Sequence, residues 1–181
     1  MPWWARDAAD KFASMKVFAV LAGALVVVAY AVWGMVVINN LGLVAGSGLP
    51  LDETLAAMEL AEQPASMIPG YVFLIVGLAT AAFWALNSLL SRRRSSTQVV
   101  VGWCVALTLG APFLFSSGFW NLNSLGDTFY DWHMEAVAAL ERPLYLVSGL
   151  SLIVLVLLGV WRFLRRSEGR RRHVVRYHRV G

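Results

Sequence analysis

Residues 126–143, "GDTFYDWHMEAVAALERP", hold four carboxylates, one imidazole and three aromatic rings, the groups in this chain that could do chemistry. Asp127, Asp131 and Glu135 are spaced by four, so they would stack on one face of a helix. His133 would lie about 160° round the axis from Asp131. A hard cation needs several converging oxygens, and a transition metal needs two or more imidazoles or thiolates. The segment completes neither set, so these four residues are candidates for a metal or catalytic site, beside the simpler interpretation of a solvated acidic face.

The rest of the chain is apolar enough to belong in a membrane. It has 181 residues, of which 59% are hydrophobic and 14% charged, with a mean hydropathy of +0.64, beyond the needs of a soluble domain. Membrane barrels are excluded, because their strands alternate apolar and polar residues. The sequence predicts an all-α membrane protein, a bundle of four transmembrane helices of about 20 residues each. The charge-free runs are residues 17–38, 67–90, 99–120 and 143–161.

The distribution of arginine predicts the orientation, because basic residues in short loops stay on the cytoplasmic side. Residues 91–98, "SRRRSSTQ", contain three arginines and no acid, and residues 162–181 contain eight arginines against one glutamate. Residues 39–66 and 121–142 are instead acidic. Both termini are therefore predicted to be cytoplasmic. The two acidic segments are predicted to form outer loops, each carrying a short surface helix.

The ends of the chain are predicted to contact lipid. Residues 1–16 should form an amphipathic helix in the cytoplasmic interface, because apolar side chains from Trp4 to Met15 share one face. The transmembrane domain then spans residues 17–161, and residues 162–181 form a basic cytoplasmic tail. Because the basic groups flank the membrane, the net charge of +4 indicates contact with anionic lipids and not with nucleic acid. The predicted interface residues are Trp3, Trp4, Arg92, Arg93, Arg94, Arg165 and Arg166.

Several membrane chemistries lack the residues they need. Haem requires axial ligands at membrane depth, whereas His133 is predicted outside and His173 and His178 in the tail. Ion relays use ionisable residues within the membrane, and the four runs contain none. The topology resembles that of the quinone-linked disulfide-forming membrane oxidases, but these need paired cysteines and this chain has only Cys104. It also resembles small membrane subunits of binding-protein-dependent carriers, without a shared motif.

The sequence favours a noncatalytic accessory or structural subunit of a larger membrane complex. That complex could serve respiration, photosynthesis, transport or secretion. Small residues four apart, such as Ala19 and Gly23, favour close helix packing. One alternative is a small component of a transporter or a lipid-handling carrier. A second alternative is a membrane enzyme that uses His133 and the acidic residues around it. The carrier's site would lie between helices near Asn87, Ser88, Pro112, Ser116 and Ser117.

No cofactor is predicted for the chain itself. A pigment or quinone held between this chain and its partners is the alternative to a simple anchoring role for the tryptophan and tyrosine rings. The expected partners are the bilayer, larger membrane subunits and anionic lipids. Thirteen arginines against two lysines are typical of a GC-rich bacterial genome, so the expected location is a bacterial inner membrane.

Overall fold

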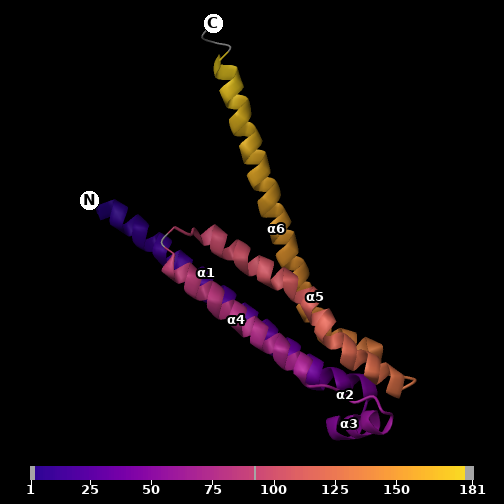
Figure 1. The fold of residues 1–181 in the computed structure, drawn as a ribbon. Helices are drawn as coiled ribbons and strands as arrows, with labels where there is room; N and C mark the ends of the chain where they lie inside the picture. The colour runs from indigo at the N-terminus through magenta and orange to yellow at the C-terminus, as the bar shows by residue number, and fades with distance from the viewer. Residues whose placement is uncertain (1–2, 92, 178–181) are drawn as a thin grey trace.

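The computed structural model describes the backbone of residues 3–91 and 93–177 and the side chains of residues 14–91 and 93–165. Within these ranges every regular element is a helix and none is a strand. Four segments are long and apolar enough to cross a membrane: Ser14–Ser47, Ile68–Leu90, Ser96–Thr128 and Met134–Arg165. The chain is therefore an all-helical membrane protein, as predicted. The elements are α1 (Trp3–Val36), η1 (Val37–Leu41), α2 (Gly42–Ser47), α3 (Leu51–Leu60), α4 (Ile68–Leu90), α5 (Ser96–Thr128) and α6 (Met134–Tyr177) (Figure 1).

Helices α1 and α4 form the tightest pair of the bundle (Figure 1). Their close approach depends on small residues, because a Cβ on Gly77 of α4 would collide with Ala31 of α1, and a Cβ on Gly34 of α1 would collide with the ring of Phe73. Small residues allow backbones to approach in lipid, where helix association depends on packing. Helix α5 lies against this pair and buries Val99, Trp103, Leu107 and Leu114 in the shared core.

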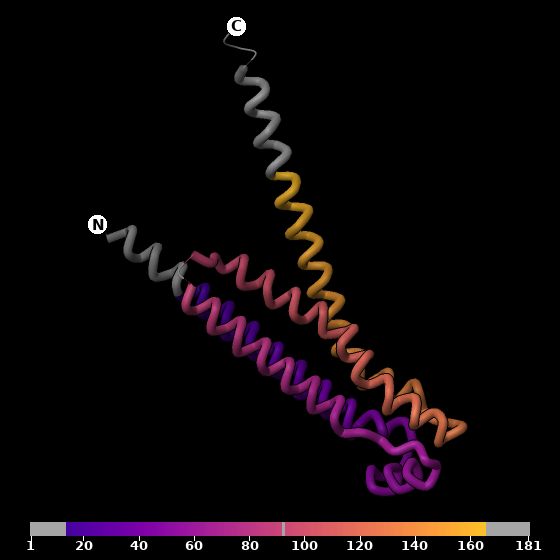
Figure 2. The backbone as a smooth tube through the Cα atoms, in the orientation of Figure 1, coloured from indigo at the N-terminus to yellow at the C-terminus, as the bar shows by residue number. Residues whose placement is uncertain are grey.

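Helix α6 packs against the other helices over only part of its length. Leu144, Ser148 and Ser151 are buried, and α6 crosses α5 in this region (Figure 1). Beyond the crossing, α6 diverges from α1, α4 and α5 (Figure 2). From Leu152 to Arg165, only Leu155 and Leu158 are partly buried and the other side chains are exposed.

The first predicted outer loop is largely helical. Helix α1 continues into the π-helical turn η1 and then into α2, which ends at Gly48 with φ of 72°, a left-handed conformation that glycine adopts without strain. Single π-helical turns such as η1 occur often at functional sites within α-helices. The helix expected within residues 39–66 is present as α3, with Asp52 and Glu53 in its first turn, where the helix dipole favours acids.

The separate surface helix expected within the second predicted outer loop, residues 121–142, is absent. Helix α5 extends to Thr128 and α6 begins at Met134, because lengthening an existing helix adds one hydrogen bond per residue without a new nucleus. The reversal between them is fixed by the His133 amide, which donates to the Gly46 carbonyl at 2.8 Å, and by Phe129 and Trp132, which pack against Leu43, Met58 and Leu125.

Candidate functional site

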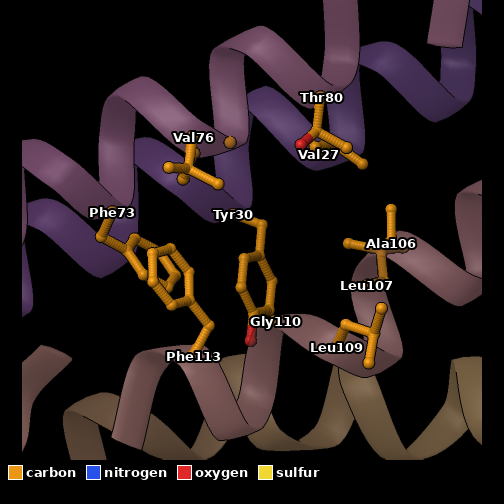
Figure 3. A pocket seen from close by; sticks show the side chains of 12 residues that line it. Val27, Tyr30, Phe73, Val76, Thr80, Ala106, Leu107, Leu109, Gly110 and Phe113 are labelled. Atoms are coloured by element: carbon orange, nitrogen blue, oxygen red, sulfur yellow. The ribbon is translucent and has the colours of Figure 1, made fainter. Parts of the chain in front are cut away.

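A pocket of about 240 Å³ lies between α1, α4 and α5. Figure 3 shows the ring of Tyr30 reaching from α1 toward Gly110 of α5, with the rings of Phe73 and Phe113 at its side. Phe73 and Phe113 are stacked with ring centres 5.2 Å apart, and Tyr30 lies 6.0 Å from Phe73. The remaining lining residues are Val27, Ala31, Val76, Gly77, Thr80, Ala106, Leu107 and Leu109.

Glycine makes room for the central ring of this pocket. A Cβ on Gly110 would lie 2.7 Å from Cε1 and 2.9 Å from the hydroxyl oxygen of Tyr30, closer than such atoms approach in proteins. The glycine therefore lets the Tyr30 side chain cross from α1 past α5 to α6. There its hydroxyl lies 3.0 Å from the Ser148 Oγ.

The polar end of Tyr30 is satisfied within the bundle. Ser148 Oγ donates to the Leu107 carbonyl at 2.7 Å, which uses the only hydroxyl hydrogen of the serine, so the Tyr30 hydroxyl donates to Ser148. Both residues are buried, at 7% and 3% exposure, where an unpaired hydroxyl would be costly. This chain of hydrogen bonds joins α1, α5 and α6 at membrane depth, and it is the structural role of Tyr30.

The chemistry of the pocket is that of an apolar binding site. Its lining contains no carboxylate, amine, imidazole or thiol, and its polar side chains are the hydroxyls of Tyr30 and Thr80. Its volume lies slightly below the roughly 300 Å³ at which drug-sized ligand pockets begin. The pocket can therefore hold one hydrocarbon chain or one apolar ring, with Tyr30, Phe73 and Phe113 forming its walls.

The acidic candidates lie on three different segments. Asp127 is in the last turn of α5, Asp131 and His133 are in the reversal, and Glu135 is in the first turn of α6. The prediction that the three acids stack on one helical face is wrong, because the chain turns between them. All four side chains are exposed. Across the described part of the chain, no group of three or more His, Cys, Asp or Glu residues could hold a metal ion.

The residues predicted for a carrier site are not brought together either. Asn87 and Ser88 lie in the last turn of α4, beside the α4–α5 turn, whereas Ser116 and Ser117 lie five to six helical turns further along the antiparallel α5. At about 1.5 Å rise per residue, the two groups are roughly 25 Å apart along the bundle. Ser116 Oγ instead donates to the Pro112 carbonyl at 2.8 Å.

Of the predicted interface residues, Arg93 and Arg94 lie in the α4–α5 turn. Arg93 is exposed there, and the Arg94 guanidinium carbon lies 4.4 Å from the centre of the Trp84 ring. Further along α6, Arg165 stacks in the same way over Trp161, at 4.1 Å. Such contacts fix an arginine near the membrane surface. The side chains of Trp3, Trp4, Arg92 and Arg166 lie outside the described residues.

The structure also contains a buried amide cluster at the opposite end of the bundle. Asn121 of α5 is 1% exposed. Its amide nitrogen donates to the carbonyls of Ile38 and Ser66, and its oxygen accepts from the Ser66 amide at 2.9 Å. Asn39 of η1 is also buried and donates to the Met67 carbonyl at 3.0 Å. These amides hold the segment between α3 and α4 against the long helices.

Sequence reasoning missed Tyr30, Phe73, Phe113 and Asn121. Each lies in an apolar run or at its end, where aromatic residues are ordinary. The sequence does not contain the register between helices, so it could not show that three aromatic residues from three runs meet at one depth. Gly110 was a partial signal, since small residues mark positions of close approach.

Comparisons with protein-family models, with curated proteins and with solved structures found no match to this chain. The fold and the geometry above define its class, an all-helical membrane protein with four helices able to span the bilayer. They also supply the observations on which a functional proposal must depend.

Proposed function

We propose that this chain is a noncatalytic accessory subunit of a larger membrane complex, and that α6 is its contact with a larger membrane subunit. The observation that supports the proposal is the divergence of α6. Its residues from Leu152 to Trp161 remain apolar, yet only Leu155 and Leu158 among them are partly buried. A membrane helix is expected to bury one stripe against neighbours, and here the apolar surface of α6 continues past the point where α6 diverges from the other helices (Figure 2).

The glycines of the bundle support the same surface. Gly23, Gly34, Gly77, Gly102 and Gly110 each face a ring or a methyl group of another helix, so closely that a Cβ would collide with it. Gly149 and Gly159 of α6 differ, because a Cβ at either position would meet nothing within 4 Å. Since glycine in a membrane helix commonly marks close helix approach, these two positions suit a helix supplied by another subunit.

The same proposal includes the orientation of the chain in the membrane and the membrane in which it resides. The arginines of residues 91–98 and 162–181 support cytoplasmic termini, an interfacial segment over residues 1–16 and contact of the tail with anionic lipids. A bacterial inner membrane remains the proposed location. Reporter fusions at residues 64 and 181 test the orientation, because the first should report the outer side and the second the cytoplasm.

Purification through a terminal tag in mild detergent, followed by mass spectrometry, tests the subunit proposal. We expect a larger membrane protein in stoichiometric amount. Gly159→Leu should abolish its recovery without unfolding the chain, whereas Ala82→Leu, on the exposed side of α4, should leave it unchanged. Recovery of the wild-type chain as a stable monomer without partners would contradict the proposal.

A carrier of apolar ligands is the second candidate function, and the pocket around Tyr30 favours it. The pocket is continuous with the lipid-facing surface, since Val76 and Leu109 of its lining are exposed. If it holds a ligand, Ala106→Phe should fill it and remove a hydrocarbon that otherwise copurifies in defined amount. The enzyme alternative predicts that His133→Ala abolishes an activity of the complex. The exposed, dispersed arrangement of the acids offers it no support.

A further inference from the structure

A second hollow runs along the surface between α1 and α5, at the end of the bundle that carries the α4–α5 turn. It is an open groove of about 720 Å³, within the roughly 300–1,000 Å³ typical of ligand sites. Helix α6 packs against the core next to this groove through Leu144 and Val147 and then diverges (Figure 1), which leaves the groove open to the membrane. Its apolar walls are formed by Met15, Phe18, Ala22 and Val26 of α1 and by Val100, Trp103, Cys104 and Leu107 of α5.

One end of this groove is polar and basic. Ser14 and Ser96 close it, and Ser96 begins α5, whose amino-terminal end carries the positive end of the helix dipole. Lys16 follows Ser14 by two residues on α1 and does not line the groove, but its ammonium donates to the Ser91 carbonyl at 2.6 Å, within the α4–α5 turn next to Ser96. The same turn carries the exposed Arg93.

Among the residues whose side chains the structure describes, the charged groups at this end are all basic. Residues 14–26 and 91–107, which supply the groove and the adjoining turn, contain one lysine and three arginines but no aspartate or glutamate. Basic sites between transmembrane helices near the membrane surface bind the head groups of anionic lipids. An apolar groove that leads to a basic end is therefore complementary to a molecule with hydrocarbon chains and an anionic head.

We propose that this groove binds one anionic glycerophospholipid. Its acyl chains lie against Phe18, Ala22 and Val100, and its phosphate lies at the end that carries Lys16, Arg93 and the amino terminus of α5. The small side chains of Ala19 and Ala22 leave the space that the chains occupy. This site is separate from the proposed subunit contact at Gly149 and Gly159, so either can fail without the other.

Native mass spectrometry from nanodiscs that contain equal amounts of phosphatidylglycerol and phosphatidylcholine tests the site. The wild-type chain should retain one phosphatidylglycerol. Ala22→Phe, which fills the groove, should lose it, whereas Ala82→Phe, the same change on the exposed side of α4, should keep it. Equal retention by both variants would overturn the proposal. Two chains per particle, reduced to one by Ala22→Phe, would also overturn it by making the groove an interface between copies.

The head-group contact has its own test. Lys16→Gln should lower the preference for phosphatidylglycerol over phosphatidylcholine about fivefold, the effect of one basic residue near an anionic surface. Arg142→Gln, an exposed basic residue at the other end of the bundle, should leave the preference unchanged. A wild-type chain without preference between the two lipids would overturn the assignment.

Cys104 provides a measurement that needs no variant. It is the only cysteine of the chain and lines the groove. Alkylation by an apolar maleimide in detergent micelles should slow when phosphatidylglycerol is added and should not respond to the same amount of phosphatidylcholine. Equal rates with the two lipids would overturn the proposal even if Ala22→Phe failed to fold.

Discussion

At the scale of single residues, the bundle depends on pairs in which a glycine makes room for a ring. Gly110 and Tyr30 are the pair with the most consequences, because the ring must pass the glycine for its hydroxyl to reach Ser148. The fold does not bring His133 and the acidic residues near it together as the metal or catalytic site that the sequence suggested. It instead buries hydroxyl and amide groups that form hydrogen bonds within the protein.

Gly110→Ala should destabilise the protein by about 1–3 kcal/mol, the usual cost of forcing extra volume into a packed site. The added Cβ would displace the Tyr30 ring and weaken its hydrogen bond to Ser148. Gly149→Ala is the control, since its Cβ would meet nothing within 4 Å. Thermal unfolding in detergent measures both variants, and equal midpoints would show that Gly110 does not make the room assigned to it.

At the scale of elements, hydropathy predicted the four long helices but not where the helices begin and end. The charge-free runs located the membrane-crossing part of α1, α4, α5 and α6, because hydrocarbon favours uninterrupted helices. The runs could not show that α5 continues to Thr128 or that α6 begins at Met134. Those limits follow from tertiary contacts, such as the His133 amide with the Gly46 carbonyl, between segments remote in sequence.

Asn121→Ala tests the amide cluster that holds the α3–α4 segment to the bundle. It removes the partner of the Ser66 amide and of two carbonyls, and a buried group left without its partner costs about 1–3 kcal/mol. Asn123→Ala, at an exposed position two residues away, should change stability little. Limited proteolysis within residues 61–67 gives a second measurement, and faster cleavage is expected for Asn121→Ala alone.

At the scale of the whole molecule, the chain is a tightly packed group of α1, α4 and α5 from which α6 departs (Figures 1 and 2). The sequence predicted the number of helices but not this departure, because the apolar run of α6 looks the same whether protein or lipid covers it. This departure leaves two surfaces uncovered. The proposed partner would bind at the glycines of α6 that contact no other helix, and the proposed lipid would bind in the groove between α1 and α5.

Site-specific photo-crosslinking in native membranes tests most directly whether α6 contacts a larger membrane subunit. A crosslinking amino acid at Val156 of α6, on the face of Gly149 and Gly159, and one at Phe83 of α4, both well exposed at 55% and 66%, sample two lipid-depth surfaces of the same chain. A subunit contact on α6 predicts one discrete protein adduct from position 156 and only lipid adducts from position 83. Lipid adducts alone from both positions would contradict the account of this chain as a subunit joined through α6.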